Sequence, residues 1–175
     1  MNGSADEIAV CVRRHLKIGW WSLSLFLCLG VVLETMHGFK VAWYVNVDTE
    51  TRRLMWRLAH AHGAFLGLVH IAFAATLFLM SSLKSQSAQD VPQPSQKKQQ
   101  KKSKRAVAVD IGWYLWASQL LTGASIALPG VFFLRGTVVR GGDPGLGILV
   151  LTVGGALLLL LAVLSVARGV TQIRL

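Results

Sequence analysis

Four apolar stretches, each long enough to cross a lipid bilayer as a helix, constrain the fold of this chain more than any other feature. They lie at about 18–39, 58–80, 111–134 and 145–167. A hydrocarbon core ~30 Å thick requires about 20 predominantly apolar residues in an α-helix. A soluble domain of 175 residues has too little interior to bury four helices that are apolar on every side. The sequence therefore predicts an all-α, integral membrane four-helix bundle.

The composition and the first apolar stretch support this organisation. Hydrophobic residues make up 53% of the chain and charged residues 15%, a balance typical of membrane proteins. The first stretch is too long for a cleavable signal peptide and contains Glu34 and His37, so we expect it to span the membrane. The predicted segments are an N-terminal segment at 1–17, a transmembrane hairpin at 18–80, a linker at 81–110, a second hairpin at 111–167 and a tail at 168–175.

The basic residues predict the orientation. Twelve of the 18 Lys and Arg residues precede the first stretch, lie in 81–110 or follow the fourth stretch, and the others lie in the remaining two loops. The positive-inside rule then places both termini and the linker in the cytoplasm. We expect a multi-pass protein of the inner cell membrane. The same distribution explains the net charge of +10 without a nucleic-acid partner.

The segment 81–110 has the composition of a disordered, polybasic linker. It is rich in Pro, Gln, Ser and Lys and contains little that a core could bury. We interpret it as a spacer that fixes the topology and makes weak contact with anionic lipid. The expected partners are the lipid bilayer and either other membrane subunits or further copies of the chain.

An internal similarity relates the two predicted hairpins. The sequence "IGWWSLSLFLCLGVVLE" from Ile18 aligns without a gap with "IGWYLWASQLLTGASIA" from Ile111, at an offset of 93 residues. This predicts a duplicated helical hairpin, a parallel repeat with its axis along the membrane normal. Chance similarity between two leucine-rich helices is the alternative. The ionisable residues that interrupt the apolar stretches belong to the first hairpin: Glu34, His37, His60, His62 and His70.

These ionisable residues define the candidate site. If the second helix begins near residue 58, His37 at the outer end of the first helix is level with His60 and His62. Glu34 shares a face with His37, because the two are three residues apart. Ionisable groups are costly inside a bilayer, so several at one depth indicate that they satisfy one another. The predicted metal ligands are Glu34, His37, His60 and His62, and the predicted cofactor-binding residues are His37, His60, His62 and His70.

The spacing within the second helix divides its histidines between two faces. At 100° per residue, His60, Gly63, Gly67 and His70 share one face, whereas His62 points to the opposite side. The glycines permit the close approach of a neighbouring helix or of a flat macrocycle. His60 and His62 therefore cannot both bind one ligand if the helix is regular.

Three interpretations of this cluster remain open. Imidazoles from two helices could bind a haem or a transition metal, with Glu34 as a ligand or as the acceptor that orients a ring. The same groups could form a proton or ion relay, with His70 about 15 Å deeper than His60 and near the bilayer midplane. A polar cluster could instead only join two helices by hydrogen bonds.

Other chemistries find little support in the sequence. The chain contains no Walker loop and no Cys-x-x-Cys motif, and the positions of Cys11 and Cys28 predict no disulfide. We therefore expect a subunit or cofactor-binding module with no catalytic activity of its own. His15 falls in the predicted cytoplasmic segment and is not part of the candidate site.

Overall fold

The computed structural model describes residues 3–89, 96–138 and 145–171, and these are helical apart from short turns. Four helices are long and two elements are short. The long helices are α1 (Gly3–Gly38), α3 (Glu50–Gln89), α4 (Gln96–Val138) and α5 (Gly145–Thr171), and the short elements are α2 (Ala42–Val45) and the 3₁₀ turn η1 (Val47–Thr49). The all-α prediction is confirmed. In the described part of the chain, four helices are long and apolar enough to cross a membrane.

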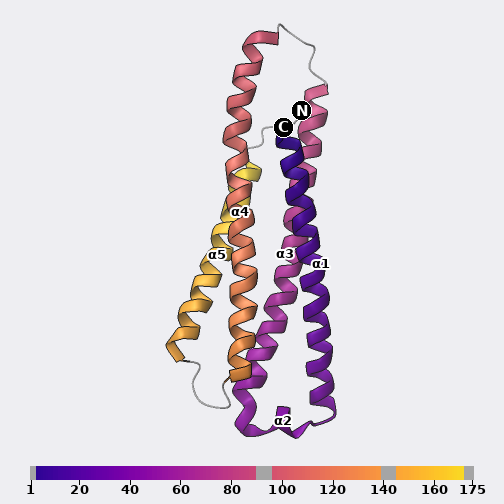
Figure 1. Cartoon of the computed structure of the whole chain (residues 1–175), viewed down its shortest axis with the longest axis vertical. Helices are drawn as coiled ribbons and strands as arrows, with labels where there is room; N and C mark the ends of the chain where they lie inside the picture. Colours follow the sequence, from indigo (N-terminus) through magenta and orange to yellow (C-terminus); the bar gives the residue numbers. More distant parts are fainter. Residues whose placement is uncertain (1–2, 90–95, 139–144, 172–175) are drawn as a thin grey trace.

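The long helices pack side by side as a bundle, with α3 and α4 in the middle (Figure 1). Helix α1 packs against α3, and α5 packs against α4. We call the end of the bundle that carries α2 the α2 end, and the end where α1 begins and α5 ends the terminal end (Figure 1). Each hairpin thus pairs its own two helices, as a duplicated hairpin requires. The duplication itself stays a prediction.

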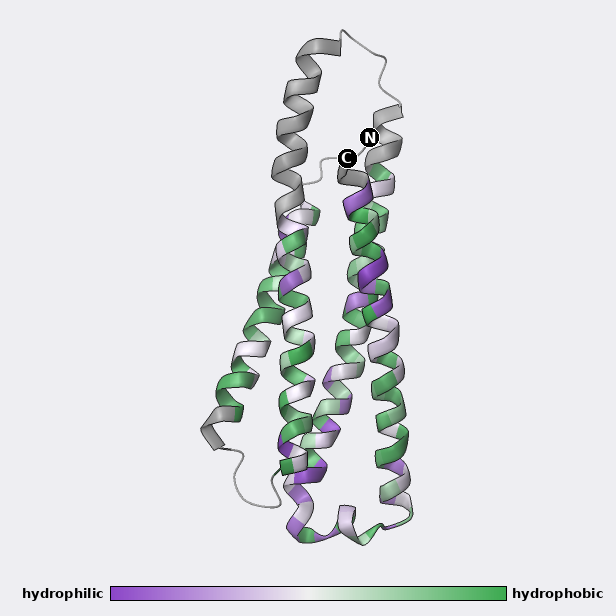
Figure 2. Ribbon diagram, viewed as in Figure 1, coloured by the Kyte–Doolittle hydropathy of each residue, from purple (hydrophilic) through white to green (hydrophobic). Residues whose placement is uncertain are grey.

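The outer helices expose most of their apolar surface. In the most apolar window of α1 and of α5 only 11% of the residues are buried, against 39% in α3 and in α4. Hydrophobic residues follow nearly the whole described length of α5, and hydrophilic residues gather where α3 meets α2 (Figure 2). Exposed apolar surface on this scale needs a non-aqueous environment. The arrangement therefore indicates contact with a lipid bilayer.

The helices extend beyond the apolar stretches from which they were predicted. Helix α1 begins at Gly3 and not at residue 18, because Ile8 and Val12 pack against a core that includes Cys11. Helix α3 begins at Glu50, eight residues before the predicted start. In the segment predicted as a linker, α3 continues to Gln89 and α4 starts at Gln96, with residues 90–95 outside the described part. Disorder in this segment stays a prediction.

A tight turn ends α1 and sets its register against α3. The amide of Lys40 donates to the His37 carbonyl and that of Val41 to the Met36 carbonyl, which is the Schellman pattern. Lys40 takes the left-handed conformation that this motif requires, with φ 50°. Arg53 of α3 then donates to the Val45 carbonyl at the end of α2. Because the connection is this short, the end of α1 lies level with the beginning of α3.

Two glycines bring the backbones of α1 and α3 into contact. A Cβ atom added to Gly67 would lie 3.0 Å from the Gly19 carbonyl oxygen and 3.0 Å from the Leu23 nitrogen. A Cβ atom at Gly63 would collide with the ring of Phe26. The predicted glycine face of the second spanning helix is confirmed, and it packs against a neighbouring helix.

Candidate functional site

The most distinctive polar contact of the interior joins His15 of α1 to His70 of α3. Both side chains are 0% exposed. Their Nδ1 atoms lie 2.6 Å apart, and the rings stack with centroids 4.8 Å apart at an interplanar angle of 25°. At this distance the two nitrogens share one hydrogen bond, in which one ring donates and the other accepts.

Two serines of α4 complete the cluster. Ser118 Oγ lies 2.7 Å from His15 Nε2, and Ser125 Oγ lies 2.8 Å from His70 Nε2. The serines are seven residues apart and therefore lie on one face of α4, two turns from each other. Arg14 also donates to Ser118 Oγ from its guanidinium. We call these five residues the histidine–serine cluster, which links three helices by hydrogen bonds.

The direction of each hydrogen bond in the cluster follows from Ser125. Its hydroxyl donates to the Leu121 carbonyl at 2.8 Å and has no second proton to give. His70 must therefore donate through Nε2 and accept through Nδ1. His15 donates through Nδ1 and accepts at Nε2, where the donor is Ser118. Both imidazoles are neutral in this order, and each of their four nitrogens has a partner.

The surroundings of the histidine–serine cluster are apolar on the side facing the interior. The ring of Phe73 packs edge-on against His15 with centroids 4.7 Å apart, and Cys11, Leu66 and Tyr114 belong to the same core. Burial of an imidazole is costly without hydrogen bonds, so the serine partners are what make this location possible.

The cluster lies near the terminal end of the apolar part of α1. Arg13, Arg14 and Lys17 are exposed on the same turns of α1 as His15. Trp20 and Trp21 follow one turn later and are 57% and 76% exposed. Cations followed by exposed tryptophans are typical of a membrane interface. His15 and His70 therefore lie where the polar and apolar parts of the bundle meet.

His60 and His62 point to opposite sides of α3, as predicted. His60 Nδ1 donates to the Phe26 carbonyl of α1 at 2.6 Å. His62 Nδ1 donates to the Leu58 carbonyl of its own helix at 2.8 Å, and its ring lies 5.0 Å from that of Phe132 on α4. Each ring therefore has its own helix partner, and no single ligand could bind both.

Glu34 and His37 are both exposed near the α2 end of α1. Glu34 lines a cavity together with His60, whereas His37 does not line it. His60 is level with Phe26, whereas His37 lies 11 residues further along α1, about 16 Å by the helical rise. Among the described side chains, no three His, Cys, Asp or Glu residues form a group that could hold a metal ion.

The expectation that His37 lies level with His60 and His62 was wrong, because it rested on a second spanning helix that begins near residue 58. Helix α3 begins at Glu50, and this shifts every facing pair toward lower numbers on α1. His70 accordingly meets His15, which the sequence analysis had placed in a cytoplasmic segment. The spacing of four between Cys11 and His15, continued by Gly19, was the signal that could have identified this face of α1.

Comparison of the chain with models of known protein families, with curated proteins and with solved structures finds no match.

Proposed function

We propose that this protein is an integral membrane protein whose His15–His70 pair takes up and releases one proton from the terminal end of the bundle. The observation that carries this proposal is the 2.6 Å contact between two buried Nδ1 atoms. Histidine is the side chain whose ordinary protonation change falls near neutral pH, and a hydrogen-bonded pair of imidazoles can hold an added proton while keeping its contact.

The hydrogen-bond order supports one position for the added proton. In the neutral pair, His15 Nε2 is an acceptor. Protonation there turns it into a donor to Ser118 Oγ, whose hydroxyl rotates away, and the contact between the Nδ1 atoms is kept. A second added proton would place N–H groups on both Nδ1 atoms and break the contact. The pair should therefore bind one proton and not two.

The charged and titratable groups around the pair come from two helices. Arg14 and Cys11 lie on α1, and Tyr114 lies on α4. Arg14 is exposed and donates to Ser118 Oγ, so the hydrogen bonds of the cluster reach an exposed side chain at the terminal end. In the other direction the hydrogen bonds end at the Leu121 carbonyl. Because the hydrogen bonds lead to an exposed side chain in one direction only, the arrangement favours a pH-responsive site over a proton path across the whole membrane.

The cofactor function predicted for the α2 end has less support. Glu34 and His60 line one cavity but His37 and His62 do not, and His60 and His62 already donate to backbone carbonyls. The histidine–serine cluster, by contrast, leaves every imidazole nitrogen bonded and adapts to an added proton by rotating one hydroxyl.

A pH titration followed by ¹⁵N NMR of histidine-labelled protein in micelles tests the proposal. We expect the signals of His15 and His70 to change together in one transition that binds one proton as the pH is lowered from about 8 to about 3. Two independent transitions, or a pair that stays neutral throughout this range, would overturn the proposal.

A further inference from the structure

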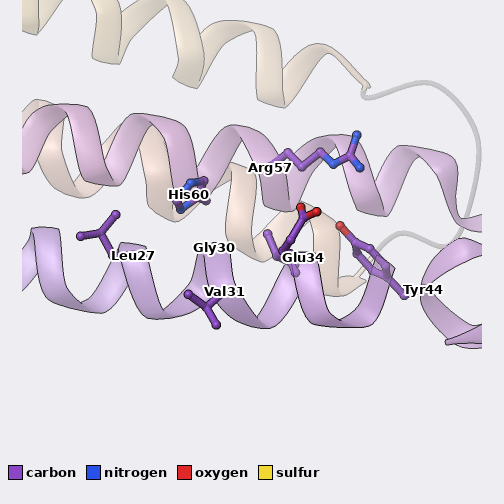
Figure 3. A pocket seen from close by; sticks show the side chains of 8 residues that line it. Leu27, Gly30, Val31, Glu34, Tyr44, Arg57 and His60 are labelled. Carbon is purple, nitrogen blue, oxygen red and sulfur yellow. The ribbon is translucent and has the colours of Figure 1, made fainter. Parts of the chain in front are cut away.

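A cavity of about 350 Å³ lies between α1 and α3 near the α2 end, away from the histidine–serine cluster (Figure 3). This volume is within the range of small-molecule sites in proteins. The side chains that matter for its chemistry are Leu27, Val31, Glu34, Tyr44, Arg57 and His60. Its polar and apolar groups lie at different depths.

The buried hydroxyl of Tyr44 is the feature that indicates a ligand. Tyr44 is 0% exposed, and its hydroxyl has no hydrogen-bond partner. In Figure 3 this oxygen points toward the carboxylate of Glu34, with Arg57 on the facing helix. Buried polar groups are satisfied in nearly all native structures, so an unpartnered hydroxyl at a cavity wall is explained by a molecule that binds there.

The charges around the cavity suit a ligand that is both cationic and anionic. Glu34 supplies a carboxylate and Arg57 a guanidinium, and both side chains are exposed at the cavity. His60 donates from Nδ1 to Phe26, which leaves its Nε2 atom as an acceptor in the neutral ring. The two acceptors, on Glu34 and His60, match an ammonium group. The guanidinium of Arg57 matches a phosphate beside it.

The apolar part of the cavity faces the bilayer. Leu27 and Val31 are 51% and 67% exposed on the surface of α1. Glu34 lies four residues before the end of α1, about 6 Å from it, whereas Leu27 lies two turns deeper. A ligand with its polar group near the membrane interface and an apolar chain below it fits this order.

We propose that the cavity binds a phosphodiester that carries a primary ammonium group, as in the headgroup of phosphatidylethanolamine. The ammonium donates to Glu34 and to His60 Nε2, the phosphate accepts from Arg57 and from the Tyr44 hydroxyl, and the acyl chains lie against Leu27 and Val31. A choline headgroup has no N–H to donate, and a glycerol headgroup has no cation for Glu34. The site therefore selects a primary amine.

Native mass spectrometry of the full chain tests this with three phospholipids of identical acyl chains. The probes are phosphatidylethanolamine, phosphatidylcholine and phosphatidylglycerol. We expect one retained phosphatidylethanolamine per chain, at about tenfold higher affinity than either competitor, as one charge-assisted contact can supply. Equal retention of all three lipids would overturn the proposal.

Variants of the polar residues sharpen the test. Glu34→Gln should remove the preference for phosphatidylethanolamine over phosphatidylcholine, and the control Glu50→Gln, at the same end but outside the cavity, should keep it. Tyr44→Phe should weaken phosphatidylethanolamine binding several-fold without lowering the melting temperature of the lipid-free protein. If Tyr44→Phe retains the lipid as strongly as the wild type, the hydroxyl is no ligand and the proposal fails.

Soluble glycerophosphoethanolamine, which carries the same phosphodiester without acyl chains, identifies the source of the headgroup. If the lipid is retained and millimolar glycerophosphoethanolamine does not displace it, the ligand is a membrane lipid. If glycerophosphoethanolamine binds in a Glu34-dependent manner and phosphatidylethanolamine is not retained, the same chemistry comes from a soluble molecule. Failure of both to bind would overturn the proposal and leave the proton proposal for the other end of the bundle intact.

Discussion

The Nδ1 atoms of His15 and His70 lie 2.6 Å apart, so one proton between two rings connects α1 to α3. The direction of this hydrogen bond is fixed. Ser125 donates its only hydroxyl proton to the Leu121 carbonyl, so His70 must donate to Ser125 through Nε2. The order of four hydrogen bonds thus depends on one serine rotamer in α4.

This order predicts different tautomers for the two rings. At neutral pH, His15 should carry its proton on Nδ1 and His70 on Nε2, because each nitrogen's partner requires it. The ¹⁵N chemical shifts of selectively labelled protein distinguish the two tautomers directly, and His15→Gln and His70→Gln assign the signals. A His70 ring protonated at Nδ1 would contradict the order and would also remove the acceptor for His15.

Loss of either serine should destabilise the bundle. Ser118→Ala removes the donor to His15 and the acceptor of Arg14, and Ser125→Ala removes the acceptor of His70. Each leaves a buried imidazole nitrogen unpaired, and we expect a loss of about 1 to 3 kcal/mol in unfolding free energy. Thermal unfolding in detergent measures it. Ser165→Ala is the matched control, since half-buried Ser165 donates to the Leu161 carbonyl of its own helix.

If Ser118→Ala and Ser125→Ala unfold at the same temperature as Ser165→Ala, the serines contribute no stability and the buried contacts described above are not important for the fold. A loss confined to Ser118→Ala would assign the effect to Arg14, because Ser125 has no contact with that residue in the cluster.

The sequence predicts the number and class of the helices well, because each apolar stretch must be about as long as the bilayer is thick. It also predicts correctly that His60 and His62 point to opposite sides of α3, since the angle per residue is fixed. The boundaries are poorly predicted. Polar residues such as Glu50 and Arg53 continue a helix without any apolar signal, and the tight turn through Lys40 depends on backbone conformation.

The expected facing residues were shifted for the same reason. The expected partner of His60 on α1 was His37 and the observed one is Phe26, eleven residues away, and the earlier start of α3 accounts for eight of these residues. The sequence therefore identifies which residues are costly in a membrane, but not which of them meet. His15 was excluded because its neighbours Arg13 and Arg14 suggest a solvated segment, although its own face of α1 is buried.

The close approach of α1 and α3 predicts a strong effect of a single methyl group. Gly67→Ala would place Cβ 3.0 Å from two backbone atoms of α1, so the helices must separate, at a cost of about 1 to 3 kcal/mol. The control is Gly154→Ala on α5, where a Cβ meets nothing within 4 Å. That substitution should stabilise the helix by up to about 1 kcal/mol, because alanine has the higher helix propensity. Equal melting temperatures for both variants would contradict the backbone contact.

The orientation of the bundle decides which compartment supplies the proton, and the charge distribution predicts that it is the cytoplasm. A reporter fused after Leu175 and one inserted near Gln96 should both report the cytoplasm, whereas one near Asp48 should report the outside. Asp48 lies in the short connection at the α2 end, opposite the exposed Arg13, Arg14 and Lys17. Because His15 lies on the turns that carry those three cations, a cytoplasmic terminal end would expose the proposed proton site to internal pH. The reversed pattern at all three positions would keep the four spans but assign the pair to external pH, and opposite locations for Leu175 and Gln96 would contradict the four-span topology itself.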